Sequence, residues 1–128
     1  MKDVSQYAIK YGFGVTSPAP WSLSHPHLGV DRPTPLRTPL VINGQLVAYT
    51  GNTGGVAAHH HLQKVENGRV VNPGNGGFVI PEPVVVFAVD RVDDSNIGRA
   101  LRIQDGKGVV WSHFHLDEIL VNVGNRIG

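Results

Sequence analysis

Residues 109–115 read VVWSHFH, a run of β-branched and aromatic side chains that predicts a β-strand. Pairs of Asn or Asp followed by Gly stand between apolar stretches at 43–44, 67–68 and 105–106. Such pairs accept the positive φ angles of tight hairpin turns, so neighbouring strands should pair in antiparallel fashion. Further strand-like stretches occur at 39–42, 45–50, 59–65, 84–89 and 99–104. The sequence therefore predicts a mainly β fold built on an antiparallel sheet.

The composition limits how much helix the chain can form. Its 128 residues include 16 Gly and 9 Pro, which repeatedly interrupt any helical apolar period. Many of the prolines lie in the first third of the chain, so we expect an irregular N-terminal arm over 1–24, with a short helix near 3–10. A chain of this length holds one modest core, which predicts a single domain over 1–128 with long loops.

Charge and hydropathy exclude several kinds of partner. The net charge is +1 and only 16% of the residues are charged, which argues against binding nucleic acid. The longest apolar run, at 84–89, is far shorter than the roughly 20 residues of a membrane span, and no secretory signal is visible. Because the chain has no cysteine, a metal site would have to use histidine and carboxylate ligands.

The seven histidines fall into three short clusters, SHPHLGVD at 24–31, AHHHL at 58–62 and SHFHLD at 112–117. Side chains two residues apart in a strand share a face, so His59 and His61 should lie together while His60 points away. The same rule predicts that His113 and His115 share a face. A single histidine in a strand is usually a half-buried polar residue, and a run of three could belong to a tag.

Taken together, the three clusters predict a metal site. Catalytic zinc takes three ligands from His, Asp or Glu and leaves a fourth position for water. Two histidine strands side by side, with the turn carrying His27 and Asp31 at their end, would supply such a set. We expect His25 and His60 to be bystanders. Asp117 is either an outer partner that orients an imidazole or a solvated carboxylate at a strand end.

Four segments carry a resemblance to a known family: HLGVD at 27–31, TGNTGGVAAHHHL at 50–62, NGRVVNP at 67–73 and GRALRIQDGKGVVWSHFHLDEILVNVGNRI at 98–127. Together they resemble the lysostaphin-type zinc endopeptidases of peptidoglycan. The resemblance implies Zn²⁺ bound by His27, Asp31 and His61. It also implies that His59 and His115 are catalytic histidines that do not bind the metal.

The family pattern is altered in composition and in order. His60 stands where Leu usually separates the paired histidines, and Leu62-Gln63 replaces the common Phe-Glu, so an outer contact normally offered by that Glu is in question. The histidine triplet also precedes the SHFHLD strand, whereas the family has the reverse order. If the chain is divided into blocks 1–42, 43–77 and 78–128, the family order is first, third, second. We interpret the block 43–77 as transposed.

An alignment that keeps the family order is the alternative. It makes His115 a zinc ligand and assigns catalysis to His61 and His113, with His27 and Asp31 as ligands in both cases. The flanking glycines and the Val-Asn-Pro stretch favour the transposed arrangement. Metal coordination depends on position in space, and extra loop length costs little entropy, so the site could survive such a change.

The resemblance implies a zinc-dependent endopeptidase that hydrolyses a peptide bond in the stem or cross-bridge of bacterial peptidoglycan. We further expect a monomer that is carried by a phage. In this interpretation His59 carries the water proton to the leaving amine, and His115 hydrogen-bonds the developing oxyanion. Two other functions fit the residues. One is a catalytically degenerate zinc-binding or structural domain on the same fold, and the other is a carbohydrate-binding domain that stacks sugars on Trp21 and Trp111.

Overall fold

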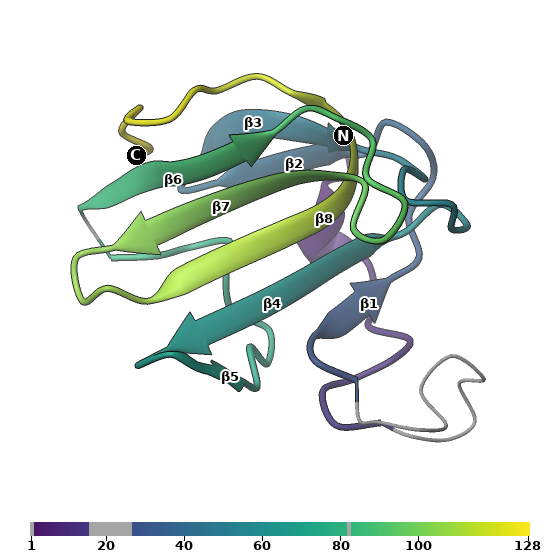
Figure 1. Cartoon of the computed structure of the whole chain (residues 1–128), viewed down its shortest axis with the longest axis horizontal. Coiled ribbons are helices and arrows are strands. Elements are labelled where there is room, and N and C mark those ends of the chain that lie inside the picture. Colours follow the sequence, from purple (N-terminus) through teal and green to yellow (C-terminus); the bar gives the residue numbers. More distant parts are fainter. Residues whose placement is uncertain (1, 16–26, 82) are drawn as a thin grey trace.

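The computed structural model describes residues 2–15, 27–81 and 83–128, which form a curled antiparallel sheet (Figure 1). Its strands are β1 (Val30–Arg32), β2 (Pro39–Ile42), β3 (Gln45–Thr50), β4 (His60–Glu66), β5 (Arg69–Val71), β6 (Val84–Asp90), β7 (Arg99–Asp105) and β8 (Val110–Ile119). The prediction of a mainly β, antiparallel fold is confirmed. Strands β1 and β5 were not predicted, because three residues are too few to show a period.

The helix predicted near 3–10 is wrong in extent, since only one 3-10 turn forms there, η1 (Val4–Gln6). Asp3 caps this turn by accepting a hydrogen bond from the Ser5 N–H, and Tyr7 already has an extended backbone. Without a longer packed face, so short a segment does not propagate as an α-helix. Among the described residues, no helix has the length and apolar character needed to cross a membrane.

Part of the predicted N-terminal arm, residues 16–24, lies outside the described residues, as do Trp21 and His25. The described part of the arm contains η1 and an isolated antiparallel bridge between Tyr11 and Asp31. This bridge ties the arm to the outer side of β1. The first residues of the chain therefore contribute to the surroundings of one of the predicted metal ligands.

Strand β8 is the centre of the sheet because it pairs along both edges. One edge pairs with β7, which in turn pairs with β6. The opposite edge is shared, with β4 beside the first half of β8 and β3 beside the second half. Strands β1 and β5 continue the sheet beyond β4, and β2 continues it beyond β3. The end of β3 and the start of β4 therefore meet beside the middle of β8.

Both Asn-Gly pairs form the predicted hairpin turns. Asn43 and Gly44 have φ values of 50° and 77° between β2 and β3, and Asn67 and Gly68 have 52° and 73° between β4 and β5. Positive φ at both central residues is what a type I′ hairpin turn requires, and Asn and Gly tolerate it best. These two turns fix the register of the hairpins that they close.

The turn between β7 and β8 differs from the prediction of a tight Asp-Gly hairpin. The Asp105 carboxylate accepts hydrogen bonds from the N–H groups of Lys107 and Val109, which lengthens the connection. The positive φ, 82°, consequently falls on Gly108.

A β-bulge in β8 decides on which face its last residues lie. Two residues of β8, Phe114 and His115, stand opposite the single residue Ala100 of β7. His115 has a φ of 62°, which is uncommon for a residue other than glycine. The prediction that His113 and His115 share a face is therefore wrong, because the extra residue turns His115 to the side of Phe114.

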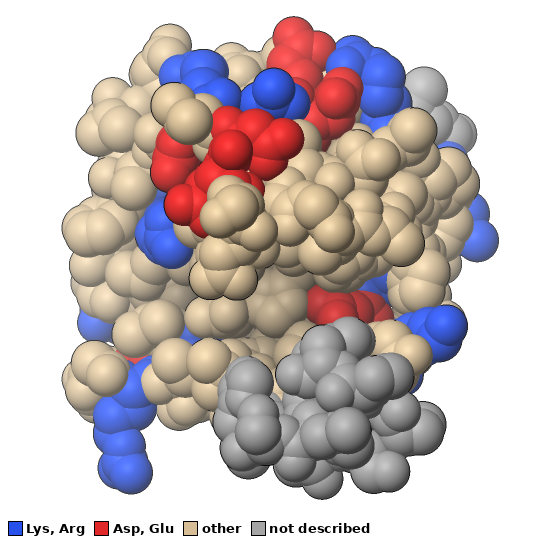
Figure 2. Space-filling model, turned by 45° about the vertical axis from the view of Figure 1, so that its right-hand side comes forward, with Lys and Arg blue, Asp and Glu red and all other residues tan. Residues whose placement is uncertain are grey.

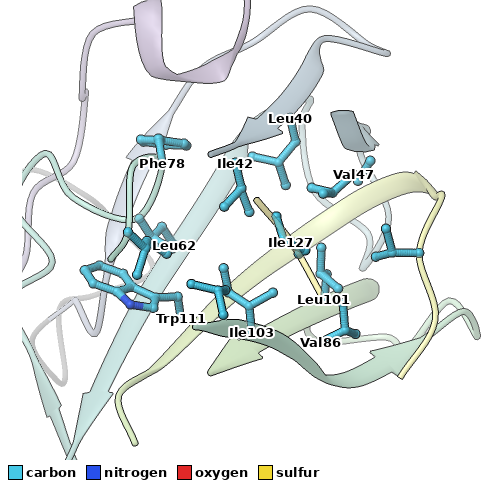
Figure 3. Close-up of a cluster of buried hydrophobic side chains, with 14 of the residues drawn as sticks. Leu40, Ile42, Val47, Leu62, Phe78, Val86, Leu101, Ile103, Trp111 and Ile127 are labelled. Atoms are coloured by element: carbon cyan, nitrogen blue, oxygen red, sulfur yellow. The ribbon is translucent and has the colours of Figure 1, made fainter. Parts of the chain in front are cut away.

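The core lies against the inner face of the curled sheet, where side chains from most strands meet (Figure 3). Leu62 of β4 and Leu101 and Ile103 of β7 are fully buried, and Trp111 of β8 packs beside them. Gly77 passes so close that a Cβ there would lie 2.8 Å from Leu62 Cδ2. Leu62 is therefore tightly packed on all sides, and a smaller side chain at this position would leave a cavity.

Leu62→Ala should lower the free energy of unfolding by about 2–5 kcal/mol, because it removes buried methyl groups and leaves a cavity. Leu46 of β3, which is 39% exposed, provides a matched control, and Leu46→Ala should cost less than about 1 kcal/mol. Urea denaturation followed by tryptophan fluorescence measures both values. Equal losses in the two variants would contradict the position of Leu62 in the core.

Candidate metal centre

The candidate metal centre forms where β1, β4 and β8 lie next to one another. Asp31 of β1 is paired with His61 of β4, and His61 is paired with Phe114 of β8. His27 lies just before β1, four residues ahead of Asp31. Strand pairing therefore brings together side chains that are about thirty residues apart in the chain.

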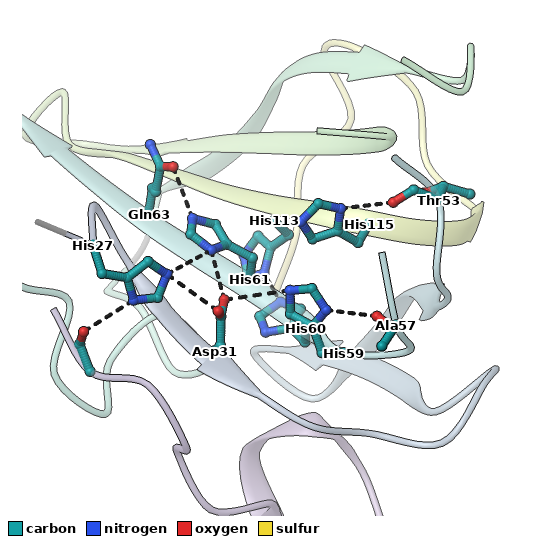
Figure 4. Close-up of polar contacts among 11 residues, drawn as sticks. His27, Asp31, Thr53, Ala57, His59, His60, His61, Gln63, His113 and His115 are labelled. Atoms are coloured by element: carbon teal, nitrogen blue, oxygen red, sulfur yellow. Dashed lines mark hydrogen bonds and ion pairs between the residues drawn. The ribbon is translucent and has the colours of Figure 1, made fainter. Parts of the chain in front are cut away.

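His27, Asp31 and His61 converge with their donor atoms close together (Figure 4). His27 Nε2 lies 3.3 Å from Asp31 Oδ2 and 3.3 Å from His61 Nδ1. His61 Nδ1 lies 2.7 Å from Asp31 Oδ1. All three residues are buried, so these polar atoms have little access to bulk water. The three ligands implied by the family resemblance are thus brought into one group.

The hydrogen bonds on the far side of each ring favour a bound cation. His27 Nδ1–H donates to the Gly12 carbonyl at 3.0 Å, and His61 Nε2–H donates to Gln63 Oε1 at 2.8 Å. These bonds fix the tautomers, so in the neutral rings His27 Nε2 and His61 Nδ1 direct lone pairs at each other and at the Asp31 carboxylate. Three electron-rich groups face one point, an arrangement that a metal ion or a proton stabilises.

The spacing of the donors also suits zinc. Zinc bonds to imidazole nitrogen are about 2.1 Å long, so two ligand atoms of a tetrahedral site lie about 3.4 Å apart. The two separations of 3.3 Å from His27 Nε2 are close to this value, whereas the 2.7 Å between His61 Nδ1 and Asp31 Oδ1 is that of a hydrogen bond and would have to widen around an ion. Two histidines and one carboxylate leave a fourth position, as in catalytic zinc sites. The group can therefore hold a divalent ion of this kind, and the donor set alone does not fix which metal binds.

The charges within the group are tightly coupled. Burial alone would raise the pKa of Asp31, but hydrogen bonds that His27 and His61 donate when their facing nitrogens carry a proton hold that pKa well below its usual range. Burial alone would lower the pKa of His27, but the hydrogen bond and the charge of Asp31 outweigh it and raise that pKa above its ordinary value. The carboxylate is therefore ionised at neutral pH and favours positive charge between the two rings.

His59 and His115 flank the three converging side chains without belonging to them. Their ring centres are 4.6 Å apart, and His59 Nε2 lies 3.6 Å from Asp31 Oδ1. His59 Nδ1–H donates to the Ala57 carbonyl and His115 Nδ1–H to the Thr53 carbonyl, both at 2.8 Å. Burial lowers the pKa of His115 to about 4. At neutral pH the buried His115 ring is therefore uncharged, with a lone pair on Nε2.

His60 and His113 lie on the opposite, core-facing side of the sheet. Both are fully buried, and His60 Nε2 and His113 Nδ1 share a hydrogen bond of 2.8 Å. The remaining ring nitrogens, His60 Nδ1 and His113 Nε2, have no partner among the described residues. His60 points away from the site, as the alternation predicts. The alternative assignment of catalysis to His113 does not fit, because its ring cannot reach the metal centre through the sheet.

Two contacts near the centre answer points that the sequence left open. Gln63 accepts a hydrogen bond from His61, so the outer contact that was in question is present, with an amide in place of a carboxylate. Asp117 is paired with Arg37 and is partly exposed, so its role is that of the solvated carboxylate. Sequence reasoning missed Gly12, Thr53 and Ala57, because they act through backbone carbonyl groups that any residue type could supply.

A cleft of about 870 Å³ opens beside the three converging side chains. Its walls include Tyr11, Pro33 and the 56–58 loop on one side, and Asn96 and Ile97 on the other. Figure 2 shows a hollow with uncharged side chains along its upper border and an acidic residue at its edge, and with acidic and basic side chains gathered higher on the same face. The cleft is within the size range of ligand-binding sites in proteins.

Comparison of the chain with protein-family models, with curated protein sequences and with solved structures finds no match in any of the three. What can be stated of the site therefore rests on its own geometry.

Gln63→Leu should weaken zinc binding by about 10–100-fold, because His61 loses the acceptor that orients its ring. Gln104→Leu is the control, since Gln104 is also a half-buried strand glutamine but donates to the Gly108 carbonyl and contacts no histidine. Titration against a competing chelator measures both affinities, and His27→Ala should abolish stoichiometric binding. Unchanged zinc affinity in Gln63→Leu would show that this contact does not support the metal.

The buried pair should make the protein less stable at mildly acidic pH. Burial lowers the pKa of His113 to about 3 and that of His60 well below its usual value. Below about pH 6.5 the unfolded chain binds a proton at each of these two histidines, while the folded chain does not. The free energy of unfolding therefore falls by up to about 1.4 kcal/mol per pH unit for each histidine as the pH is lowered.

The double variant His60→Leu/His113→Leu should remove most of this loss. Urea denaturation in the presence of a chelator, at about pH 7.5 and about pH 5, compares it with the unchanged protein. His27 contributes in the opposite direction in both proteins, since its raised pKa favours the folded state on acidification. Parallel pH profiles of the two proteins would mean that the pair is not held neutral in the core.

Proposed function

We propose that the protein is a zinc-dependent endopeptidase that hydrolyses peptide bonds of bacterial peptidoglycan. One observation carries this proposal: two imidazoles that are not ligands, His59 and His115, lie beside the converging donor atoms of His27, Asp31 and His61. In a structural metal site the protein ligands fill all coordination positions, so histidines that do not bind the ion have no chemical role there. Hydrolysis requires them, since water must lose a proton and the leaving amine must gain one.

Zinc held by the three ligands would supply an activated water and polarise the scissile carbonyl. His59 is suited to proton transfer, because the Nδ1–H bond to Ala57 leaves its Nε2 as the accepting atom. Asp31 Oδ1, 3.6 Å away, stabilises the positive charge that His59 gains. From there the proton can pass to the amine as the peptide bond breaks.

His115 is suited to stabilise the oxyanion that develops on the carbonyl. Because Nδ1–H is committed to the Thr53 carbonyl, donation from Nε2 requires the charged imidazolium. Burial disfavours that charge, as the lowered pKa of His115 indicates, so the ring takes up a proton from solvent only as negative charge develops beside it, and returns that proton to solvent when the carbonyl re-forms. The interaction is therefore stronger in the transition state than with bound substrate, which is the condition for catalysis.

The choice of peptidoglycan as substrate is supported by the resemblance of the four sequence segments to lysostaphin-type endopeptidases. The cleft is compatible with a slender peptide, since Ala57, Ala58 and Pro33 line it with small side chains. A monomer that acts on the cell wall is part of the same proposal.

His59→Ala should lower the rate of hydrolysis at least about 100-fold and still bind one zinc per chain, because His59 moves a proton and is not a ligand. The rate is measured as clearing of a purified peptidoglycan suspension and as release of new amino termini. Asn52→Ala, at an exposed position of the same loop, is the control and should retain activity.

Zinc content and activity together separate the possible outcomes. Loss of zinc in His59→Ala would make His59 a ligand and contradict its assigned role. If the zinc-loaded wild-type protein cleaves neither peptidoglycan nor glycine-rich peptides, and a chelator changes nothing, the endopeptidase proposal is wrong. The catalytically degenerate domain would then be the better description.

A further inference from the structure

A row of polar side chains leads away from the metal centre across the outer face of the sheet. Gln63 of β4 is paired with Ser112 of β8, and Ser112 is paired with Arg102 of β7. Gln63 has the same orientation as His61, since the two are separated by one residue in β4. The row therefore begins at the acceptor that holds His61 and ends at a guanidinium two strands away.

Arg102 is held in place by ring contacts that continue to His61. Its guanidinium carbon lies 5.2 Å from the centre of the Phe114 ring. Phe114 in turn stacks on His61, with the ring centres 5.3 Å apart and the planes within 3° of parallel. A guanidinium stacked on an aromatic face keeps its N–H donors free at the edge of the plane. Arg102 is therefore oriented without using its hydrogen-bonding capacity.

No carboxylate or carbonyl within the described residues accepts a hydrogen bond from Arg102, although the side chain is half-buried. Two other arginines of the same region differ from Arg102 in this respect. Arg37 is paired with Asp117 and Glu118, and Arg99 donates to two backbone carbonyls. A positioned guanidinium with five unused donors matches the geometry of a carboxylate, which it can bind through two parallel hydrogen bonds.

We propose that Arg102 binds a carboxylate of the peptide substrate and so selects acidic peptides. This inference rests on the proposed peptidase function. An extended peptide advances about 3.4 Å per residue, so the two ring contacts between His61 and Arg102 span at most about three residues. The carboxylate therefore belongs to a residue within about three positions of the cleaved bond. Its source is either an acidic side chain or the C-terminus of the peptide.

The test uses matched peptides that differ only in this charge. In the first set, the three positions on either side of the cleaved bond are tested one at a time, with glutamate in one peptide and glutamine in its partner. In the second set, the C-terminus is free or amidated at the same distance. For wild-type protein, one carboxylate form should have a KM about 10–100-fold lower than its amide, with kcat changed less than about twofold. The pair that responds identifies the source of the carboxylate.

Arg102→Gln should raise KM for the preferred peptide to the value of its amide and leave kcat unchanged. Arg102→Lys keeps the charge but loses the two-pronged contact, so it should restore only part of the preference. Arg69→Gln, an exposed arginine on β5, is the control and should behave as wild type. If Arg102→Gln keeps the wild-type preference, or wild type has none, the carboxylate assignment is wrong.

A binding measurement keeps the two proposals distinguishable. Calorimetry of the same peptides with zinc-loaded His115→Ala requires no turnover. Tighter binding of the carboxylate form, lost in His115→Ala/Arg102→Gln, would support the role of Arg102 even if no peptide is cleaved and the endopeptidase proposal fails. Equal binding of acid and amide forms would overturn the role of Arg102 even if wild type proves to be a peptidase.

Discussion

The arrangement of the site depends on the left-handed backbone conformation of His115 in the bulge of β8. A residue other than glycine loses roughly 1–2 kcal/mol in this conformation, so other contacts must hold it there. Its N–H donates to the Ile97 carbonyl and its carbonyl accepts from the Gly51 N–H, both at 2.9 Å. Its ring donates to the Thr53 carbonyl. The loops before β4 and before β7 therefore determine on which face this imidazole lies, and without the bulge His115 would enter the core.

The sheet separates its histidines into two environments that differ in chemistry. On the outer face, His27 and His61 each have an oxygen acceptor on one ring nitrogen and direct the other nitrogen toward the converging donor atoms, which is the orientation that a metal ligand needs. On the inner face, the only hydrogen bond that the rings of His60 and His113 make with the described part of the chain is the one between them. Their two unpaired nitrogens cost roughly 1–3 kcal/mol each, so an apolar pair would stabilise the core better. In the triplet at 59–61, His59 and His61 therefore lie at the metal centre, while His60 lowers the stability of the core.

Much of the fold was predictable because it depends on local signals. Runs of β-branched residues marked six of the strands, and two Asn-Gly pairs marked hairpins through their tolerance of positive φ. A metal site was predictable because the histidines fall into three clusters, whereas the particular set of His27, Asp31 and His61 was implied by the family resemblance. The bulge was not predictable, since it depends on backbone groups of Gly51, Thr53 and Ile97, whose side chains give no sign of it. His113 precedes the bulge, so its core-facing side follows from the regular alternation of the strand.

The order of the blocks along the chain is compatible with the position of their ends in space. The interpretation of 43–77 as a transposed block joins residue 42 directly to residue 78 in the family order. In the structure the Asn43 N–H donates to the Phe78 carbonyl at 2.8 Å, and Asn43 Oδ1 accepts from the Ile80 N–H at 2.7 Å. Asn43, the neighbour of one end of that junction, is therefore hydrogen-bonded to Phe78, its other end. Because β4 takes its place between β1 and β8 by strand pairing, the metal ligands meet whichever of the two histidine strands the chain reaches first.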